Sequence, residues 1–215
     1  MSRKKKWGKI GSPHSAKRKT YLKKIRRQQG KTSKRKTTTQ KQPVRKIKPV
    51  SLRQTKQFHK HKKKIPGAIR SRVDNHEVIF GAHALNVRFP AYLERQTMDY
   101  DIFSPTPKRD ALEAEKALDN VFGGDFFYTH PALHPGTWKV RSYVDQEGYV
   151  DYTKPKKKIP YDRIKGKKYV KLSHVKKTIK KTLKDPESSY RHGKDRDALN
   201  RIRIYEQMKK KRRSK

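Results

Sequence analysis

The chain has 215 residues, with 60 Lys and Arg against 19 Asp and Glu, so its formal net charge is +41. It contains no cysteine, which excludes disulfide bonds and cysteine-ligated zinc. No apolar run approaches the roughly 18 residues that a membrane-spanning helix needs, and the N-terminus lacks the apolar stretch of a secretory signal. We therefore expect an intracellular protein that is not secreted and does not bind a membrane. It would be cytoplasmic, nucleoid-associated or inside a virion.

The positive charge is concentrated at the N-terminus, because residues 1–70 contain 27 Lys and Arg and no acidic residue. Such a segment cannot bury enough apolar surface to offset the entropy lost on ordering. We expect residues 1–65 to form a long, largely disordered basic arm, in which residues 52–64 could become helical against a phosphate backbone. The arm would bind RNA or DNA through phosphates, without reading sequence; a solubilising or localising tail is the alternative. The cations expected to bind nucleic acid are Arg3, Lys4, Lys5, Lys6, Lys17, Arg18, Lys19, Lys34, Arg35, Lys36, Lys62, Lys63 and Lys64.

Residues 66–215 have ordinary apolar runs and a length that suits one domain, with Pro66-Gly67 as the expected hinge to the arm. Alternating apolar residues predict strands at 76–80, 98–103, 126–128, 137–144, 149–153, 161–164 and 168–171. Helical spacing, with Pro or Gly at several ends, predicts helices at 82–89, 107–121, 172–183 and 190–211. This order predicts an α+β fold in which helices flank a mixed sheet and two helices close the chain.

Two acidic residues lie one residue apart on the second expected strand. Asp99 and Asp101 should share a face, because residues i and i+2 of a strand point the same way. Asp151 lies between apolar residues on a later strand. Three converging carboxylates can bind two divalent metal ions, which clamp the phosphates of a nucleotide. Gly81, at the turn after the first strand, would let the backbone approach those phosphates closely.

In this order the motifs resemble those of the nucleotidyltransferase superfamily, which has the polymerase-beta-like fold, and in particular its minimal and abortive-infection-type members. Gly81 to Leu85 matches the hydrophobic-Gly-small motif, and Arg95 to Ile102 resembles the Arg-x-Ser/Thr-x-Asp-x-Asp motif. Val150-Asp151-Tyr152 fits the third acid, and Arg191 to Asp195 resembles an Arg-x-Lys-Asp segment on a late helix. Ala82 stands where the family usually has Gly or Ser, so it offers no hydroxyl to a phosphate.

The resemblance implies a nucleotidyltransferase-like sheet and a magnesium-dependent enzyme. It would transfer a nucleoside monophosphate from a nucleoside triphosphate to a hydroxyl of a nucleic-acid or protein acceptor. Asp99, Asp101 and Asp151 would be the catalytic residues and would hold two Mg²⁺ ions. The residues implied to bind the nucleotide, or to order the strand beside it, are Gly81, Ala82, Arg95, Thr97, Lys177, Lys181, Arg191 and Lys194.

Two other functions remain open from the sequence. The chain could be a non-enzymatic, basic nucleic-acid-binding protein of the packaging, nucleoid or ribosome-associated kind, built on the same scaffold. In that case its binding would depend steeply on salt and would be indifferent to Asp99 and Asp101. It could also be a toxin-like nucleotidyltransferase that modifies a host protein or transfer RNA, with a separate antitoxin-like protein as its partner.

Overall fold

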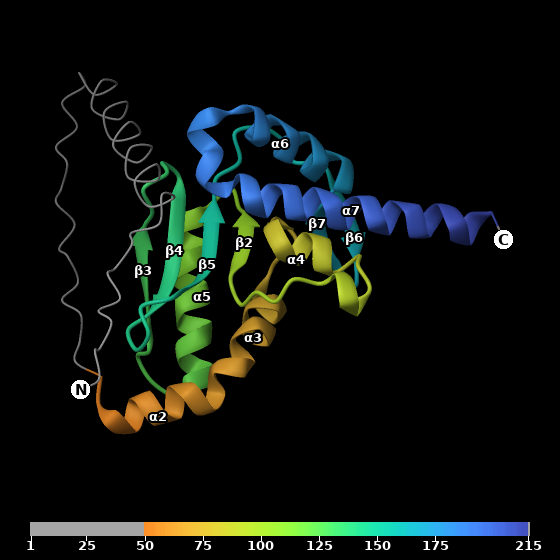
Figure 1. Cartoon of the computed structure of the whole chain (residues 1–215). Coiled ribbons are helices and arrows are strands. Elements are labelled where there is room, and N and C mark those ends of the chain that lie inside the picture. The colour runs from red at the N-terminus through yellow and green to blue at the C-terminus, as the bar shows by residue number, and fades with distance from the viewer. Residues whose placement is uncertain (1–49, 215) are drawn as a thin grey trace, which may run out of the picture.

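The computed structural model describes residues 50–214 and arranges them around one seven-stranded sheet (Figure 1). The strands lie in the order β3-β4-β5-β2-β1-β7-β6. β1 pairs with β7, and β2 with β5, in parallel, and the other neighbours are antiparallel, so the sheet is mixed as expected. The strand bounds are β1 Val78–Phe80, β2 Tyr100–Phe103, β3 Phe127–Pro131, β4 Thr137–Ser142, β5 Gly148–Thr153, β6 Tyr161–Ile164 and β7 Lys167–Val170.

Helices flank this sheet, which confirms the α+β class. Their bounds are α2 Leu52–His61, α3 Ile65–Arg72, α4 Gly81–Asn86, α5 Pro107–Phe122, α6 Leu172–Lys184 and α7 His192–Arg213, with short 3-10 helices η1 Lys62–Lys64, η2 Ala91–Leu93 and η3 Pro186–Arg191. α5 has Pro107 at its first position and ends at Gly123, whose φ of 70° is left-handed, so the expected start and stop signals both operate. Among residues 50–214, no helix is long and apolar enough to cross a membrane.

The main hydrophobic core lies on one face of the sheet, against α2, α3 and α5. Ile102 of β2 and Val150 and Tyr152 of β5 are fully buried there. Side chains alternate between the two faces of a strand, so Asp101 and Asp151 point to the opposite face. The fold thus buries the apolar half of these strands and leaves their carboxylates beside the C-terminal helices.

The folded part begins earlier than the sequence led us to expect. Phe58 of α2 and Ile65 of α3 have no exposed surface and belong to the main core. The ring of Phe58 lies 5.4 Å from that of Phe122, centroid to centroid. Residues 52–65, expected to be arm, are therefore helical against the protein's own core. The expectation for the remaining arm, residues 1–49, lies outside the described part of the chain.

Local signals explain this N-terminal helix. The Ser51 hydroxyl accepts a hydrogen bond from the backbone N–H of Gln54, and the Gln54 side chain accepts one from the Ser51 backbone, so a capping box starts α2. Phe58 is the buried residue of this otherwise basic helix. Its burial favours docking of α2 on the core, because burying a phenylalanine side chain stabilises by about 1.5–3 kcal/mol. Pro66-Gly67 lies inside α3, where Pro is tolerated in the first turn, and is not a hinge.

A second hydrophobic core joins the C-terminal helices to α4. It contains Leu85 and Phe89 beside Ile179 of α6 and Ala198 and Ile202 of α7. In Figure 1, α6 and α7 lie together at the upper end of the sheet, and α7 then runs away from it toward the C-terminus. This core fixes the two helices opposite the carboxylates of β2 and β5.

Candidate functional site

Asp101 and Asp151 are direct neighbours in the parallel pair β2–β5. Phe80, the last residue of β1, pairs with Asp101 on its other side. Asp99 lies just before β2, which begins one residue later than expected. All three aspartates line one pocket of about 930 Å³ between the sheet and the C-terminal helices. The fold therefore brings the three predicted carboxylates to one cavity.

The acidic side chains of the pocket are crowded around Asp101. Burial, reinforced by the charges of Asp151 and Asp99, raises the pKa of Asp101 to about 7. The charges of Lys139 and Arg191 act in the opposite direction but are weaker. The Lys139 ammonium donates a hydrogen bond to Asp151 and forms an ion pair with it. A cation held between these carboxylates would relieve their mutual repulsion.

The donor set fits magnesium, since the three aspartates offer carboxylate oxygens, which hard divalent cations prefer as ligands. The three carboxylates are not gathered into a tight cluster, however. Among the described residues, only His76, Glu77 and Asp110 place one ligand atom each within 4.8 Å of the others. Asp99 accepts a hydrogen bond from the Thr97 hydroxyl, and Lys139 engages Asp151. Metal binding would require these two carboxylates to exchange their protein partners for the ion.

The Asp101 carboxylate lies so close to Gly81 that only glycine fits at this position. Its φ is 66°, in the left-handed region, and a Cβ atom built on it would lie 2.0 Å from Oδ2 of Asp101. No side chain fits that space, so the small-residue motif has a direct structural cause. Ala82 also lines the pocket. His83 does not; its ring stacks on Tyr100 at 3.7 Å, and burial lowers its pKa to about 4, which keeps it neutral.

The segment before β2 is held to α4 by one side chain. Asn86 donates to the carbonyl of Arg95 at 2.7 Å and accepts from its N–H at 3.1 Å. This double contact places the Arg95 side chain at the pocket wall. Thr97 is not a wall residue, but its hydroxyl holds Asp99. Both residues therefore lie where the motif requires them.

The C-terminal helices form the far wall of the pocket. Arg191 and Lys194 line it, and Arg191 also forms an ion pair with the buried Asp195 at 3.4 Å. Lys177 and Lys181 do not line it; they are exposed on another face of α6. The binding role expected of these two lysines stays a prediction. The polar wall residues that the sequence analysis did not name include His174, Thr178, Thr182, Tyr190 and Arg201.

A signal for part of this wall was present in the sequence. His174, Thr178 and Thr182 recur every four residues, which marks one face of a helix beside the apolar stripe. Lys139 had no such signal. It reaches Asp151 only because β4 and β5 pair in a register that places the two residues side by side. No sequence motif marks Lys139, and the β4–β5 register becomes known only from the tertiary structure.

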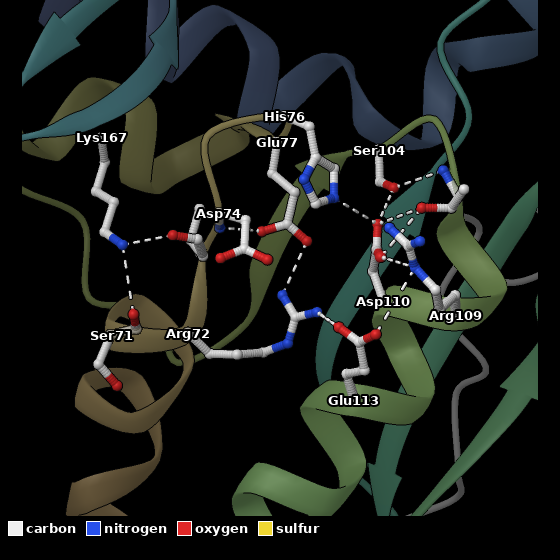
Figure 2. A network of polar contacts seen from close by, with 12 residues as sticks. Ser71, Arg72, Asp74, His76, Glu77, Ser104, Arg109, Asp110, Glu113 and Lys167 are labelled. Atoms are coloured by element: carbon white, nitrogen blue, oxygen red, sulfur yellow. Dashed lines mark hydrogen bonds and ion pairs between the residues drawn. The ribbon is translucent and has the colours of Figure 1, made fainter.

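A second polar cluster lies at the other end of β1 and β2 (Figure 2). Glu77, with no exposed surface, accepts from Arg72 at 3.0 Å and from the backbone N–H of Asp74 at 2.7 Å. Asp110 accepts from the Ser104 hydroxyl, from Thr106 and from His76 at 3.3 Å. Each oxygen of the two carboxylates therefore accepts from at least one protein donor. The cluster ties α3, β1 and α5 together, and an ion here would have to compete with these donors.

Of the cations expected to bind nucleic acid, only the last three lie in the described residues. Lys62 forms ion pairs with Asp145 at 2.9 Å and with Glu147 at 3.3 Å. Lys63 and Lys64 are exposed. The others fall within residues 1–49. For all of them, contact with nucleic acid stays a prediction.

Comparison with known proteins supports the fold. No protein-family model matches the chain, and no curated protein matches it by sequence. Among solved structures, the Megavirus polyadenylate synthase is similar with a TM-score of 0.52 and 19% identity, over 95% of this chain and 39% of that one. JHP933 from Helicobacter pylori is similar over 63% of this chain and 58% of that one, with 14% identity; its TM-score of 0.36 does not establish a common fold. The present chain spans well under half of the synthase, and their likeness shows that the two share a fold.

Proposed function

We propose that this protein is a magnesium-dependent nucleotidyltransferase. The observation that carries the proposal is the pairing of Asp101 with Asp151, beside Gly81, in a pocket large enough for a nucleotide. Ligand pockets are usually about 300–1,000 Å³. The raised pKa of Asp101 supports it, because strongly perturbed carboxylates in a cleft are typical of functional sites. The nucleotidyltransferase-like fold agrees with this chemistry.

Asp99, Asp101 and Asp151 would hold the two Mg²⁺ ions proposed for the site. When bound, such ions neutralise phosphate charge and lower the pKa of an acceptor hydroxyl. The hydroxyl oxygen would attack the α-phosphorus of a nucleoside triphosphate, the bond to the β-phosphate would break, and pyrophosphate would leave. Asp151 would orient the acceptor, because its strand β5 is the one that continues into β4 and β3, on the side of the pocket away from β1.

The positive side chains of the far wall would bind the triphosphate. Arg191 and Lys194 face the aspartates across the pocket, and Arg95 adds a third cation at its edge. Thr97 would hold the Asp99 carboxylate until an ion replaces its hydrogen bond. Gly81 and Ala82 would let the backbone approach the phosphates. Lys177 and Lys181 could reach only a nucleotide that extends beyond the pocket.

The basic arm would tether the enzyme to RNA or DNA and raise the local concentration of acceptor. A deletion that tests this tether must stop at residue 49. Removing residues 1–65 would also remove Phe58 and Ile65 from the core. Loss of affinity in that longer deletion would therefore report unfolding as well as loss of charge.

The direct test is label transfer from α-labelled nucleoside triphosphates, with magnesium, to RNA, DNA or protein acceptors. We expect transfer by the full chain and a loss of at least about a hundredfold in Asp99→Asn and in Asp101→Asn. Asp162→Asn is the matched control, because Asp162 is partly exposed on β6 and outside the pocket. Equal transfer by the two pocket variants and the control would refute the assigned site.

The non-enzymatic reading is the second candidate, and the acid-free stretch of 27 cations favours it. It predicts tight, salt-sensitive binding to nucleic acid with no transfer to any acceptor. It also predicts that Asp101→Asn leaves binding unchanged with or without magnesium. The same set of variants therefore decides between the two functions.

A further inference from the structure

Strands β3 and β4 extend the sheet beyond Asp151, and their side chains on its face are aromatic or basic. The strand register pairs Lys139 of β4 with Asp151 and with His130 of β3. Directly paired residues point to the same face, so His130 and Lys139 lie in one row with Asp151. Tyr128 and Arg141 form the equivalent pair two residues further along. We call Tyr128, His130, Lys139 and Arg141 the outer platform.

The opposite face of these strands belongs to the main core. Thr129 donates a hydrogen bond to the carbonyl of Ala111 in α5 at 3.2 Å, and Val140 is fully buried. The platform side chains are only half-buried. In Figure 1, α7 begins near the tops of β5 and β2 and runs away from β3 and β4. The two C-terminal helices that wall the pocket thus leave the platform side of the sheet clear.

The platform is held in a fixed geometry by the β4–β5 hairpin. The ring of Tyr128 lies 4.6 Å from that of Tyr143 and 5.7 Å from that of His130, each tilted by 31°. The Tyr128 hydroxyl donates to the side chain of Gln146 at 2.8 Å, and Arg141 donates to the Gln146 carbonyl. The buried Tyr143 thus backs the Tyr128 ring, and the partly exposed rings of Tyr128 and His130 offer a surface on which flat molecules can stack.

Cations lie among these rings. Arg141 and Lys139 contribute two, of which Lys139 pairs with Asp151, and Lys62 pairs with both acids at the hairpin tip, Asp145 and Glu147. Burial, with the charges of Arg141 and Lys139, lowers the pKa of His130, so its ring acts as a neutral aromatic surface. Aromatic rings interleaved with cations on a sheet are the recurring means of binding single-stranded nucleic acid, because bases stack and phosphates pair with the cations.

We propose that the outer platform binds the terminal nucleotides of a single-stranded nucleic-acid acceptor and directs its hydroxyl to Asp151. The proposal rests on the proposed function and names its acceptor class. β3 lies two strands from β5, which is roughly 10 Å at the usual strand spacing. A base stacked on Tyr128 therefore belongs to a nucleotide close behind the reacting end. Because stacking accepts any base, this surface selects single strands and not a sequence.

The test measures binding of a short fluorescein-labelled single-stranded oligonucleotide to the full chain by anisotropy, at raised salt that suppresses contacts of the arm. Tyr128→Ala should weaken binding roughly 5- to 150-fold, the range expected for losing one base stack. Tyr128→Phe keeps the ring and removes only the hydrogen bond to Gln146, so it should bind like the parent chain. Arg141→Gln should reduce the dependence of affinity on salt by about one counterion.

Ultraviolet cross-linking of the same complex locates the strand. Cross-links in residues 127–142 support the platform, and cross-links confined to residues 1–49 overturn it. Unchanged affinity in Tyr128→Ala also overturns it, as does transfer to protein acceptors with no oligonucleotide bound. Melting temperatures show that each variant is folded, and Tyr128→Leu replaces Tyr128→Ala if the smaller side chain unfolds the hairpin.

Failure of the platform can be told apart from failure of the proposed function. Stabilisation of the chain against heat by magnesium and a nucleoside triphosphate reports the pocket and does not involve Tyr128. If that stabilisation is absent, the proposed function is wrong whatever the oligonucleotide does. If it is present and equal in Tyr128→Ala and the parent chain, any loss of oligonucleotide affinity belongs to the platform alone.

Discussion

Two groups of acidic side chains lie at opposite ends of β1 and β2, in opposite surroundings. At one end, Glu77 and Asp110 are fully buried and every carboxylate has donors from the protein. At the other end, Asp101 lies beside Asp99 and Asp151 on the sheet side of a pocket. The hydrogen bonds from Ser104 and its neighbours outweigh the effect of burial and hold the pKa of Asp110 below its usual value, whereas that of Asp101 rises to about 7.

The difference shows why proximity alone does not identify a metal site. The Glu77–Asp110 group is the tighter of the two, yet its partners are complete, so it serves to join α3, β1 and α5. The pocket group is looser. Thr97 and Lys139 engage Asp99 and Asp151, yet burial and these two acids still raise the pKa of Asp101. A bound cation would offset that effect. Four experiments sharpen this contrast.

The largest effect is expected from Arg72→Met. This change leaves the buried Glu77 carboxylate without its ion-pair partner, and breaking a buried pair costs about 3–5 kcal/mol of the free energy of unfolding. Denaturant unfolding measures the loss, and Arg53→Met, an exposed change on α2, should cost at most about 0.5 kcal/mol. A similar loss in both variants would show that the network contributes nothing specific.

The pH dependence of stability should reveal the strain on Asp101. Its folded pKa lies above that of an unfolded aspartate, so between pH 4 and 7 the folded state binds more protons and stability falls as pH rises. At about 1.4 kcal/mol per pKa unit, the total fall is up to about 4 kcal/mol. Asp101→Asn should remove this contribution and be more stable than the parent chain at pH 8. Parallel pH profiles for the two proteins would contradict it.

Magnesium should stabilise only through the pocket. At a hundred times its dissociation constant, an ion that binds the folded state adds about 2.7 kcal/mol to the free energy of unfolding. Thermal melts with and without the ion should show this gain in the parent chain and in His76→Ala, but not in Asp101→Asn. Loss of the gain in His76→Ala would move the metal site to the other end of the strands.

The smallest effect is expected at the turn between β1 and α4. Gly81→Ala must shift Asp101 or the backbone, because the added Cβ would meet the Asp101 carboxylate, and we expect a loss of about 1–3 kcal/mol. Gly67→Ala, in α3 with nothing near its Cβ, should be neutral or stabilise by up to about 1 kcal/mol. If the two variants unfold alike, the close contact at Gly81 does not constrain the site.

The sequence predicted the strands and helices well where local signals decide them. Pro107 and Gly123 bound α5 as expected, and β6 and β7 lie close to the strands expected at 161–164 and 168–171. The expected arm, residues 1–65, is too long because it was inferred from the basic composition of the whole segment, and Phe58 was given no weight. Phe58 is a single ring among cations, and only its packing partners, which are distant in sequence, make residues 52–65 part of the domain.

The candidate site was predictable in its motifs and not in its partners. Asp99, Asp101, Asp151 and Gly81 could be named because their meaning lies in spacing along the chain. Two other features could not be predicted: Lys139 pairs with Asp151, and Lys177 does not line the pocket. Strand register and helix rotation decide them, and both are set by packing.

The sequence by itself determined which residue types could form a metal and nucleotide site, because the spacing of Asp99 and Asp101 keeps them close together even though Asp99 lies just before β2. Only the tertiary structure decided that Asp151 would be the neighbour of Asp101, through the parallel pairing of β2 with β5. It also decided which acidic group would receive protein donors at every carboxylate oxygen and which would line a pocket. Hydrogen-bond partners and burial come from distant segments brought together, and these two quantities set the charge that a site can hold.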